Sequence, residues 1–373
     1  MKKNGNTKRL LCIVGSMNAG GAETFLMKVY RALDKNKYQM DFYVASKEEG
    51  FYEEEIISMG GKIHRSIPKS KRIVKSFNTL KDIVRKEKYD YVMRISQHSL
   101  STIDLLAAKF GGAKVLVFRS SNTKTYGGRV HQILHLVFKW LSITIPNIKI
   151  APSTEAAEFM FGKGCIQRKK AIILKNAIAL DNFHFDLDTR TAIREEFQIK
   201  NKFVVGHVGR FNNAKNHSFL IDVFNEIVKK HKESVLILVG KGELESDIKN
   251  KIKTLGLTDK VIFTGVRSDV PNIMMAMDVL IFPSFFEGMP NVIIEAQATG
   301  LHCIISDSIT REAGITKLVD YLSLKDSTKI WAEKALEYRQ EDVVRESMND
   351  KFKIAGYDID SVTDTFVRTV FIE

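Results

Sequence analysis

Short apolar runs alternate with longer amphipathic segments along the first half of the chain. The runs cover 9–15, 40–46, 62–67, 89–96, 113–120 and 148–153. Apolar runs of this length, bounded by polar or glycine-containing segments, are typical of buried strands, and the segments between them are long enough for helices. This alternation predicts stacked βαβ units around a parallel sheet.

A second series of the same kind follows. Its expected strands cover 203–209, 235–240, 260–265, 279–284 and 302–307, and its expected helices cover 217–232, 244–255, 270–277 and 291–299. The sequence therefore predicts an α/β protein with two Rossmann-like, doubly wound domains in tandem. We place them at 1–185 and 186–373, and the last helix is allowed to pack back on the first domain. A length of 373 residues fits two domains.

No apolar run reaches the roughly 18 residues that a membrane-spanning helix needs. The stretch "HQILHLVFKWLSITIPNI" at 131–148 comes closest, but Lys139 and two histidines interrupt it. We interpret it as a helix of the core, with a place at a membrane interface as the alternative. An integral membrane protein is not expected.

Charge divides the chain unequally. Residues 1–185 hold 32 Lys and Arg against 15 Asp and Glu, which gives +17, and 186–373 hold 25 against 29, which gives −4. The basic half indicates an anionic partner, nucleic acid or an acidic membrane, or simply a well-solvated surface. Ten Lys and Arg fall in 62–88 without stacking aromatics, and no RNP, KH or helix-turn-helix pattern is present. We therefore expect no nucleic-acid partner, and peripheral contact between the basic N-terminal domain and an anionic membrane is the hypothesis we keep.

The cysteines indicate a reducing compartment. Cys12, Cys165 and Cys303 are far apart, odd in number and without metal-ligand spacing. The first apolar run is too short for a signal peptide and is better explained as a strand. We expect a cytoplasmic protein, at the inner face of the plasma membrane if the membrane hypothesis holds.

Two loops that follow strands carry residues suited to anions, and ligands of doubly wound sheets bind at such loops. In "GSMNAGGAETF", Gly20 and Gly21 allow a ligand close to the backbone before a helix, although two glycines often form only a tight turn. In "GHVGRFNNAKNHSFL", Arg210 and Lys215 are suited to phosphate oxygens, with a solvated rim as the alternative.

A third loop carries two glutamates eight positions apart. In "FPSFFEGMPNVIIEAQATG", Glu287 lies in the loop after a strand, while Glu295 lies in a helix that begins near Pro290. A loop carboxylate can accept hydrogen bonds from hydroxyl groups, and one in the helix can hold a ribose diol or can serve as a helix charge. Backbone N–H groups at the helix start can bind an oxyanion, and they belong to Gly288, Met289 and Asn291.

Five stretches together resemble a known family. They are "GGAETF", "GHVGRFNNAKNHSFLIDVF", "LVGKGELE", "VIFTGVRSDV" and "FPSFFEGMPNVIIEAQATG", in that order over nearly the whole chain. They are similar to the family 4 (group 1) retaining glycosyltransferases of the GT-B fold, whose Glu-x7-Glu motif matches Glu287 and Glu295. The resemblance implies two Rossmann-like domains facing a cleft, with a nucleotide-sugar donor on the C-terminal domain and the acceptor on the N-terminal one.

The resemblance also implies roles for single residues. Arg210 and Lys215 would neutralise the donor diphosphate, which Gly20 and Gly21 would approach from the other domain. Glu287 would contact sugar hydroxyls. Glu295 would bind the ribose, and the backbone of Val266 and Arg267 would seat the base.

No metal or other cofactor is expected, because two fixed cations and a helix N-terminus can stabilise a leaving diphosphate. The reaction implied is a retaining, hexosyl-type transfer in which the leaving phosphate takes the acceptor proton. The subtype resembles bacterial enzymes of capsular and extracellular polysaccharide synthesis, which implies a UDP-sugar donor and a lipid-linked saccharide acceptor.

Some positions depart from the family pattern. Many relatives have a histidine shortly after the fourth strand, and His98 in "VMRISQHSLST" is our candidate for it, with an exposed or core histidine as the alternative. Lys241 stands where relatives often have an acidic residue. Arg119 and Asn122 are expected to contact the acceptor. The alternative functions are a nucleotide-sugar epimerase of the same fold and a binding protein without turnover.

Overall fold

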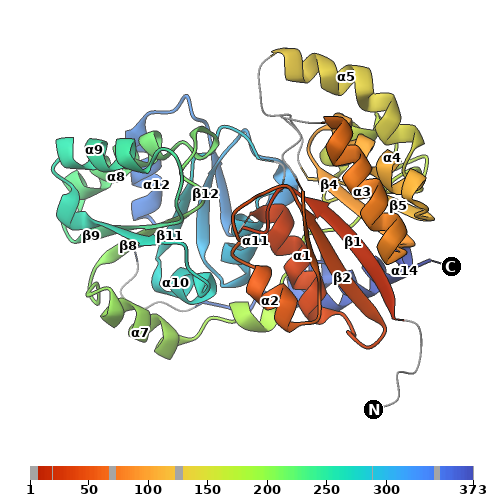
Figure 1. The fold of residues 1–373 in the computed structure, drawn as a ribbon. Helices are drawn as coiled ribbons and strands as arrows, with labels where there is room; N and C mark the ends of the chain where they lie inside the picture. Colours follow the sequence, from red (N-terminus) through yellow and green to blue (C-terminus); the bar gives the residue numbers. More distant parts are fainter. Residues whose placement is uncertain are drawn as a thin grey trace. The chain divides into compact units, whose positions relative to one another are not determined.

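The computed structural model describes residues 7–18, 20–66, 73–121, 129–287, 289–339 and 345–372. The chain forms two compact units (Figure 1). Unit 1 comprises Met1–Ile178 and Gly356–Glu373, and unit 2 comprises Ala179–Ala355. The sequence placed the junction after 185, seven residues later. The difference arises because the short 3₁₀ helix η2 (Leu180–Phe183) already packs against helices of unit 2.

Unit 1 is built on a seven-stranded parallel sheet. Its strands are β1 (Lys8–Val14), β2 (Tyr38–Val44), β3 (Ile63–Arg65), β4 (Tyr91–Ser96), β5 (Val115–Ser120), β6 (Ile148–Ala151) and β7 (Ile172–Ile173). Their spatial order is β3-β2-β1-β4-β5-β6-β7, so the winding reverses between β1 and β4. The six strands predicted from the sequence are present, and β7 is an addition.

Helices cover both faces of this sheet. They are α1 (Gly21–Ala32), α2 (Glu53–Ser58), α3 (Ile73–Glu87), α4 (Thr102–Gly111), α5 (Arg129–Thr144), α6 (Thr154–Phe161) and α14 (Ile359–Val370). One core includes Phe25 of α1 and Phe366 of α14, and the other includes Leu80 of α3 and Leu105 of α4. The last helix is thus part of unit 1, and Figure 1 shows it in dark blue.

The prediction that the helix at 131–148 belongs to the core is wrong. Most of the large apolar side chains of α5 are exposed, and Leu136 is 68% exposed. Only the opposite side of α5 is buried, through His135, Leu141 and Ser142. The physical reason is that neighbouring elements offer polar partners to this helix, as described below.

Unit 2 repeats the architecture with six parallel strands. They are β8 (Phe203–Val208), β9 (Ser234–Val239), β10 (Val261–Gly265), β11 (Val279–Phe282), β12 (His302–Ser306) and β13 (Val319–Leu322), in the order β10-β9-β8-β11-β12-β13. The winding reverses between β8 and β11. Loops that follow these two neighbouring strands therefore meet at one edge of the sheet, where ligands of such folds bind.

Four helices of unit 2 lie at the predicted positions. The helices of this unit are α7 (Leu187–Glu196), α8 (His217–Lys230), α9 (Glu245–Thr254), α10 (Val270–Ala276), α11 (Asn291–Ala298), α12 (Thr328–Leu336) and α13 (Asn349–Ile354), and the four at predicted positions are α8 to α11. Their apolar sides and the strands form a core around Phe224, Leu236 and Trp331. The strand β13 and the helices after it were not predicted.

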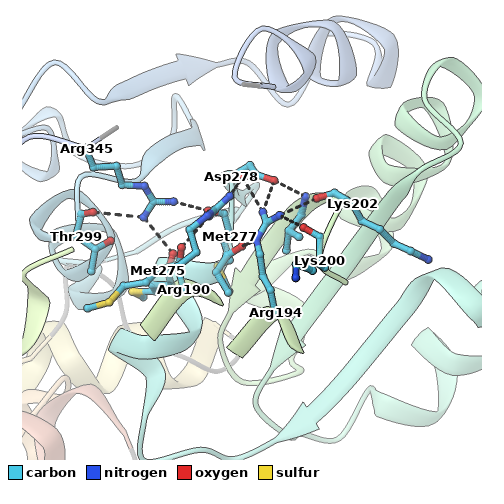
Figure 2. Close-up of polar contacts among 12 residues, drawn as sticks. Arg190, Arg194, Lys200, Lys202, Met275, Met277, Asp278, Thr299 and Arg345 are labelled. Atoms are coloured by element: carbon cyan, nitrogen blue, oxygen red, sulfur yellow. Dashed lines mark hydrogen bonds and ion pairs between the residues drawn. The ribbon is translucent and has the colours of Figure 1, made fainter. Parts of the chain in front are cut away.

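A buried arginine cluster fixes the opposite edge of the unit 2 sheet (Figure 2). Asp278, just before β11, accepts from Arg190 Nη2 at 2.6 Å and from Arg194 Nη2 at 2.8 Å. Its Oδ2 also accepts the backbone N–H of Val204 at 2.7 Å. The side chains of the two arginines and the aspartate are at most 9% exposed. The cluster therefore ties α7 to the first residues of β8 and β11.

One carboxylate does not balance the cations of this cluster, and backbone carbonyls supply the remaining acceptors. Arg190 Nη1 donates to Met275 O at 2.8 Å, and Arg345 donates to Met277 O. These carbonyls lie at the end of α10, where a helix has unpaired acceptors and a partial negative charge. Burial nevertheless lowers the pKa of Arg345 to about 9. The arginines thus cap the C-terminus of α10 with hydrogen bonds.

Three further observations bear on chemistry. The three cysteines are free thiols with buried side chains. Within the described residues, no helix is long and apolar enough to cross a bilayer. The same part of the chain contains no grouping of three His, Cys, Asp or Glu side chains that could hold a metal ion.

Candidate functional site

An ion pair joins the loops that follow β8 and β11. Lys215 Nζ lies 2.6 Å from Glu287 Oε1, and the two side chains are 17% and 16% exposed. Lys215 and Glu287 were expected to have separate roles, and their contact was not predicted from the sequence. Their contact follows from the topology, because β8 and β11 are neighbours at the point where the winding reverses.

Backbone geometry places Lys215 in this pair. It is the last residue of the 3₁₀ helix η3 (Asn213–Lys215), and the Asn212 side chain caps η3 by accepting the N–H of Lys215. Asn216 then adopts a left-handed conformation with φ 54°, from which α8 begins. The two loops are also joined directly, since the N–H of Phe285 donates to Ala214 O at 2.9 Å.

The Lys215 ammonium lies over the aromatic ring of Phe282. Its Nζ lies 4.5 Å from the ring centroid of Phe282, which stacks on His207 at 5.3 Å. A cation over an aromatic face is stabilised by the ring quadrupole. A Cβ at Gly209 would lie 3.2 Å from Lys215 Cε and 3.3 Å from His207 Nε2, so a larger residue there would crowd the lysine.

Two buried histidines complete this support. His207 and His217 pack edge to face at 4.6 Å, and His207 Nδ1 is bonded to Ile281 O at 2.9 Å. Burial, with repulsion from Lys215, lowers the pKa of His217 to about 4, and burial lowers the pKa of His207 well below its usual value. Both rings are therefore neutral at pH 7, which leaves Lys215 as the cation of this group.

Acid is expected to destabilise unit 2 through these histidines. An unfolded chain binds a proton near pH 6.5, but folded His217 resists it until about pH 4, so stability is complete above pH 6.5 and falls as the pH drops between these values. Between pH 7 and 4.5 the loss attributable to His217 is about 2–3 kcal/mol. Urea denaturation from pH 7 to 4.5 measures it. His217→Asn should flatten the pH slope, whereas the exposed His184→Asn should not, and equal slopes would contradict the assignment.

The end of β9 approaches the same loop through glycine. Gly240 has φ +133°, and a Cβ there would lie 2.2 Å from Gly209 O. The N–H of Phe211 donates to Lys241 O at 3.1 Å, which continues the contact between the two loops. Arg210 extends from this loop, is 72% exposed, and lies 3.3 Å from Glu243. Arg210 and Lys215 therefore belong to one loop, but each has its own carboxylate partner.

The helix α11 begins beside Glu287. Met289 is buried, Asn291 is the first helical residue, and Glu295 is partly buried further along the helix. Gly288 lies outside the described residues. Buried Gln297 secures the helix by donating to Ala313 O at 2.7 Å and accepting the N–H of Thr316 at 2.9 Å. The N-terminus of α11 and the Lys215–Glu287 pair thus share one edge of unit 2.

Val266 and Arg267 follow β10, which lies beyond β9 and is two strands away from β8. Val266 is 47% exposed. The Arg267 guanidinium forms two hydrogen bonds of 2.7 Å with Asp269, which raise its pKa, and another of 3.1 Å with Glu196. Its side chain is therefore committed within unit 2, and only its backbone fits the role expected for it.

The remaining candidates belong to unit 1. Gly20 precedes α1 with φ −103°, a value open to any residue, and Gly21 is the exposed first residue of α1. A Cβ on Gly20 would lie 2.4 Å from Glu23 Oε2, the end of a flexible side chain. Neither the backbone angle of Gly20 nor a fixed neighbour therefore requires glycine at this position.

His98 caps the 3₁₀ helix η1 (Ser99–Ser101) after β4. Its Nδ1 accepts the N–H of Leu100 at 3.1 Å, so its Nε2 carries the proton and donates to His131 O at 2.9 Å. The side chain is partly buried, which is neither the core nor the fully exposed alternative. The ring is thus held between β4 and α5.

Arg119, expected to contact an acceptor, is 1% exposed. Its Nη2 donates to Asn176 Oδ1 at 2.5 Å, and its guanidinium lies 3.8 Å from the Phe25 ring centroid. Burial lowers its pKa to about 9. It supports the core of unit 1 in this structure, and Asn122 lies outside the described residues.

These sites and the two doubly wound sheets define a class. Sequence comparison matches 19–182 to "Glycosyltransferase Family 4" and 202–339 to "Glycosyl transferases group 1". EpsF of Bacillus subtilis (strain 168), which is named as a glycosyltransferase, is 34% identical over 340 residues, covering 88% of this chain and 87% of that protein. The chain is therefore a glycosyltransferase. It belongs to the group 1 glycosyltransferases, family 4.

Two further comparisons extend this result. An Escherichia coli enzyme named UDP-Gal:alpha-D-GlcNAc-diphosphoundecaprenol alpha-1,3-galactosyltransferase is 32% identical over 248 residues, covering 63% of this chain and 62% of that enzyme. HepE of Anabaena, solved with UDP and glucose, has a TM-score of 0.78 at 16% identity and covers 99% of this chain and 100% of its own. The fold is accordingly GT-B, as the sequence resemblance implied.

Proposed function

We propose that this glycosyltransferase transfers a sugar from a UDP-sugar to a lipid-linked saccharide, with retention of anomeric configuration and without a metal ion, in the synthesis of a bacterial surface polysaccharide. The observation that carries the proposal is the Lys215–Glu287 pair at the adjoining ends of β8 and β11. The names of the relatives support its finer parts. The E. coli enzyme is named for a UDP-sugar and a diphosphoundecaprenol acceptor, and HepE was solved with UDP.

The transfer needs positive charge near the leaving group. A UDP-sugar carries a diphosphate whose bond to the sugar must break, so negative charge grows on the leaving phosphate. Lys215 is a cation that the neutral histidines and Phe282 hold in place, and the start of α11 adds N–H groups of the same polarity. Preorganised positive groups of this kind are worth most where charge develops. Arg210, exposed beside them, would reach the same diphosphate.

Glu287 would change its partners when the donor binds. In the ligand-free pair its carboxylate neutralises Lys215. When the diphosphate takes over that role, the carboxylate would accept hydrogen bonds from sugar hydroxyls. Donor binding would thus exchange one anionic partner of Lys215 for another, and hydroxyl donors would replace the ammonium as the partner of the carboxylate. Glu295 would hold the ribose, and the backbone of Val266 and Arg267 would face the base.

The chemistry proposed needs no separate base. The bond between the anomeric carbon and the phosphate oxygen breaks, and a bond to the acceptor oxygen forms on the same face. The acceptor proton passes to the departing phosphate oxygen. Unit 1 would supply Gly20 and Gly21 to the diphosphate and His98 to the acceptor. The enzyme would work in the cytoplasm, at the inner face of the plasma membrane, with its basic half facing anionic lipid.

A donor panel tests the proposal. Purified protein is incubated with UDP-, GDP- and ADP-sugars, with EDTA, and with bacterial lipid extract added or omitted, and nucleotide release is measured. We expect release from one UDP-sugar that survives EDTA, rises with lipid extract and yields a glycosylated lipid. Nucleotide release only with a GDP- or ADP-sugar would overturn the assignment of a UDP-sugar donor. Loss of nucleotide release with EDTA would overturn metal independence. Conversion of the donor to an epimer without acceptor would overturn transfer itself.

A further inference from the structure

The helix α5 leaves much of its apolar surface exposed. Six large apolar side chains, each between 39% and 68% exposed, lie on its outer face: Val130, Ile133, Leu136, Val137, Trp140 and Ile143. At 100° per residue these positions fall within an arc of about 140°. We call this arc the outer face of α5. The helices of soluble proteins normally bury such an arc against the core.

Polar groups hold the other side of α5 to unit 1. The Ser142 hydroxyl donates to Met160 O at 2.8 Å, and Lys139 Nζ donates to Glu158 O at 3.2 Å. The His135 ring is 3% exposed and stacks on Phe159 at 4.4 Å. Because specific hydrogen bonds and a stacked ring fix this orientation, the outer face cannot turn inward without breaking them.

Charge along the sequence indicates what covers the outer face. Residues 1–185 carry a net charge of +17, and residues 105–154, which include α5, contain seven Lys or Arg and no Asp or Glu. Of these, Lys109 is exposed, Lys114 is 76% exposed beside Asp90, and Arg119 is buried. An apolar helical face set in a sequence that is basic and free of acidic residues matches the interface of an anionic bilayer. A contiguous exposed apolar patch of this kind marks an interaction surface.

We propose that α5 is an interfacial membrane helix, which lies in the plane of an anionic bilayer with its outer face among the acyl chains. With 16 residues it is about 24 Å long, and it does not meet the requirements of a spanning helix. This inference rests on the proposed function in one respect: membrane contact would give the enzyme access to a lipid-linked acceptor. It replaces the basic stretch at 62–88 as the main membrane contact.

The helix α5 is also hydrogen-bonded to His98, the histidine proposed to meet the acceptor. His98 Nε2 donates to His131 O at 2.9 Å, and the Ser99 hydroxyl donates to His135 O at 2.7 Å. The 3₁₀ helix η1 is thus fastened to the inner side of α5. A bilayer that holds the outer face brings η1 and His98 to its surface, where a saccharide head group would emerge.

The two tryptophans of the chain provide the assay. Trp140 lies on the outer face and is 59% exposed, whereas Trp331 is fully buried in unit 2. In Trp331→Phe, all tryptophan emission comes from Trp140. Adding phosphatidylglycerol vesicles should shift this emission to the blue and reduce iodide quenching at least threefold, with a smaller effect from phosphatidylcholine. Co-sedimentation of the wild-type protein with the same vesicles gives a second readout if the variant folds poorly.

A matched pair of variants separates the outer face from general hydrophobicity. Leu136→Ser with Val137→Ser should lower the vesicle partition coefficient at least tenfold. Ile354→Ser, at a side chain of unit 2 that is 89% exposed, should leave it unchanged. Equal partitioning of all three proteins would overturn the proposal.

Other occupants of the outer face give distinct results that also overturn it. A blue shift that grows with protein concentration in the absence of lipid would indicate a second copy of the chain. Protection of Trp140 from iodide at every concentration without vesicles would indicate another part of the same chain. Vesicle binding and donor turnover are measured separately, so vesicle binding without nucleotide release would refute the proposed function alone, and the reverse would refute only the membrane helix.

Discussion

Replacing Lys215 with methionine is expected to lower kcat/KM for the donor sugar by about 100- to 1,000-fold, the usual loss when one group that stabilises transition-state charge is removed. Methionine keeps the apolar stem over Phe282 but removes the ammonium. The effect should appear mainly in kcat, because charge on the leaving phosphate grows as the bond breaks. Nucleotide release from the donor identified in the panel measures kcat and KM. The affinity for UDP measures how much of the loss comes from weaker binding before the bond breaks.

Glu287→Gln tests whether the pair acts as one unit. We expect a comparable loss, and the double variant should be little worse than the worse single one, because residues that act together are not additive. Lys229→Met, which breaks an exposed pair with Glu226 on α8, serves as the matched control and should keep full activity. Losses that simply multiply in the double variant would show that Lys215 and Glu287 act independently.

Asp278→Ala is expected to cost unit 2 about 3–5 kcal/mol of unfolding free energy, because it leaves two buried guanidinium groups without their carboxylate. The two guanidinium groups belong to Arg190 and Arg194, whose side chains are at most 9% exposed. The N–H of Val204 loses its acceptor as well. Few single substitutions elsewhere in this unit remove so many buried partners at once.

The two units need separate signals, since a protein with two domains need not unfold in one step. In a Trp140→Phe background, buried Trp331 reports on unit 2 alone, and urea denaturation followed by its fluorescence gives the free energy. Glu333→Ala, which removes a solvent-exposed pair with Lys230, is the matched control and should change stability by less than about 1 kcal/mol. A loss for Asp278→Ala no larger than this control would contradict the role assigned to the cluster.

The parts of the fold that the sequence predicted share one physical cause. Strands of a parallel sheet are buried on both faces, so β8, β9 and β11 appear as nearly continuous apolar runs with glycine or proline after them. Their boundaries fixed the loops that carry Lys215 and Glu287. The supporting histidines, His207 and His217, lay within the stretch that defined the loop, but nothing in their spacing showed that both rings are buried.

Other features depend on tertiary contacts that no local pattern encodes. Asp278 meets arginines more than eighty positions earlier in the chain. The period of an amphipathic helix shows that it has two faces but not which face is buried, and for α5 the hydrogen bonds of Ser142 and His135 decided the matter against the usual rule. Arg119 was expected to contact the acceptor because it lies at the end of a strand, but its partners in unit 1, Asn176 and Phe25, are distant in the sequence.

The division of the chain has a consequence for its synthesis. Unit 2 is one continuous stretch, whereas unit 1 needs α14, whose Val362, Phe366 and Val370 complete a core begun by β1 and α1. Domains usually fold from the N-terminus as the chain leaves the ribosome. Here the half that is translated first is the last to be completed, so nascent unit 1 exposes an unfilled apolar surface until the final helix emerges. A chaperone that binds nascent chains would find its site on unit 1 for almost the whole of translation.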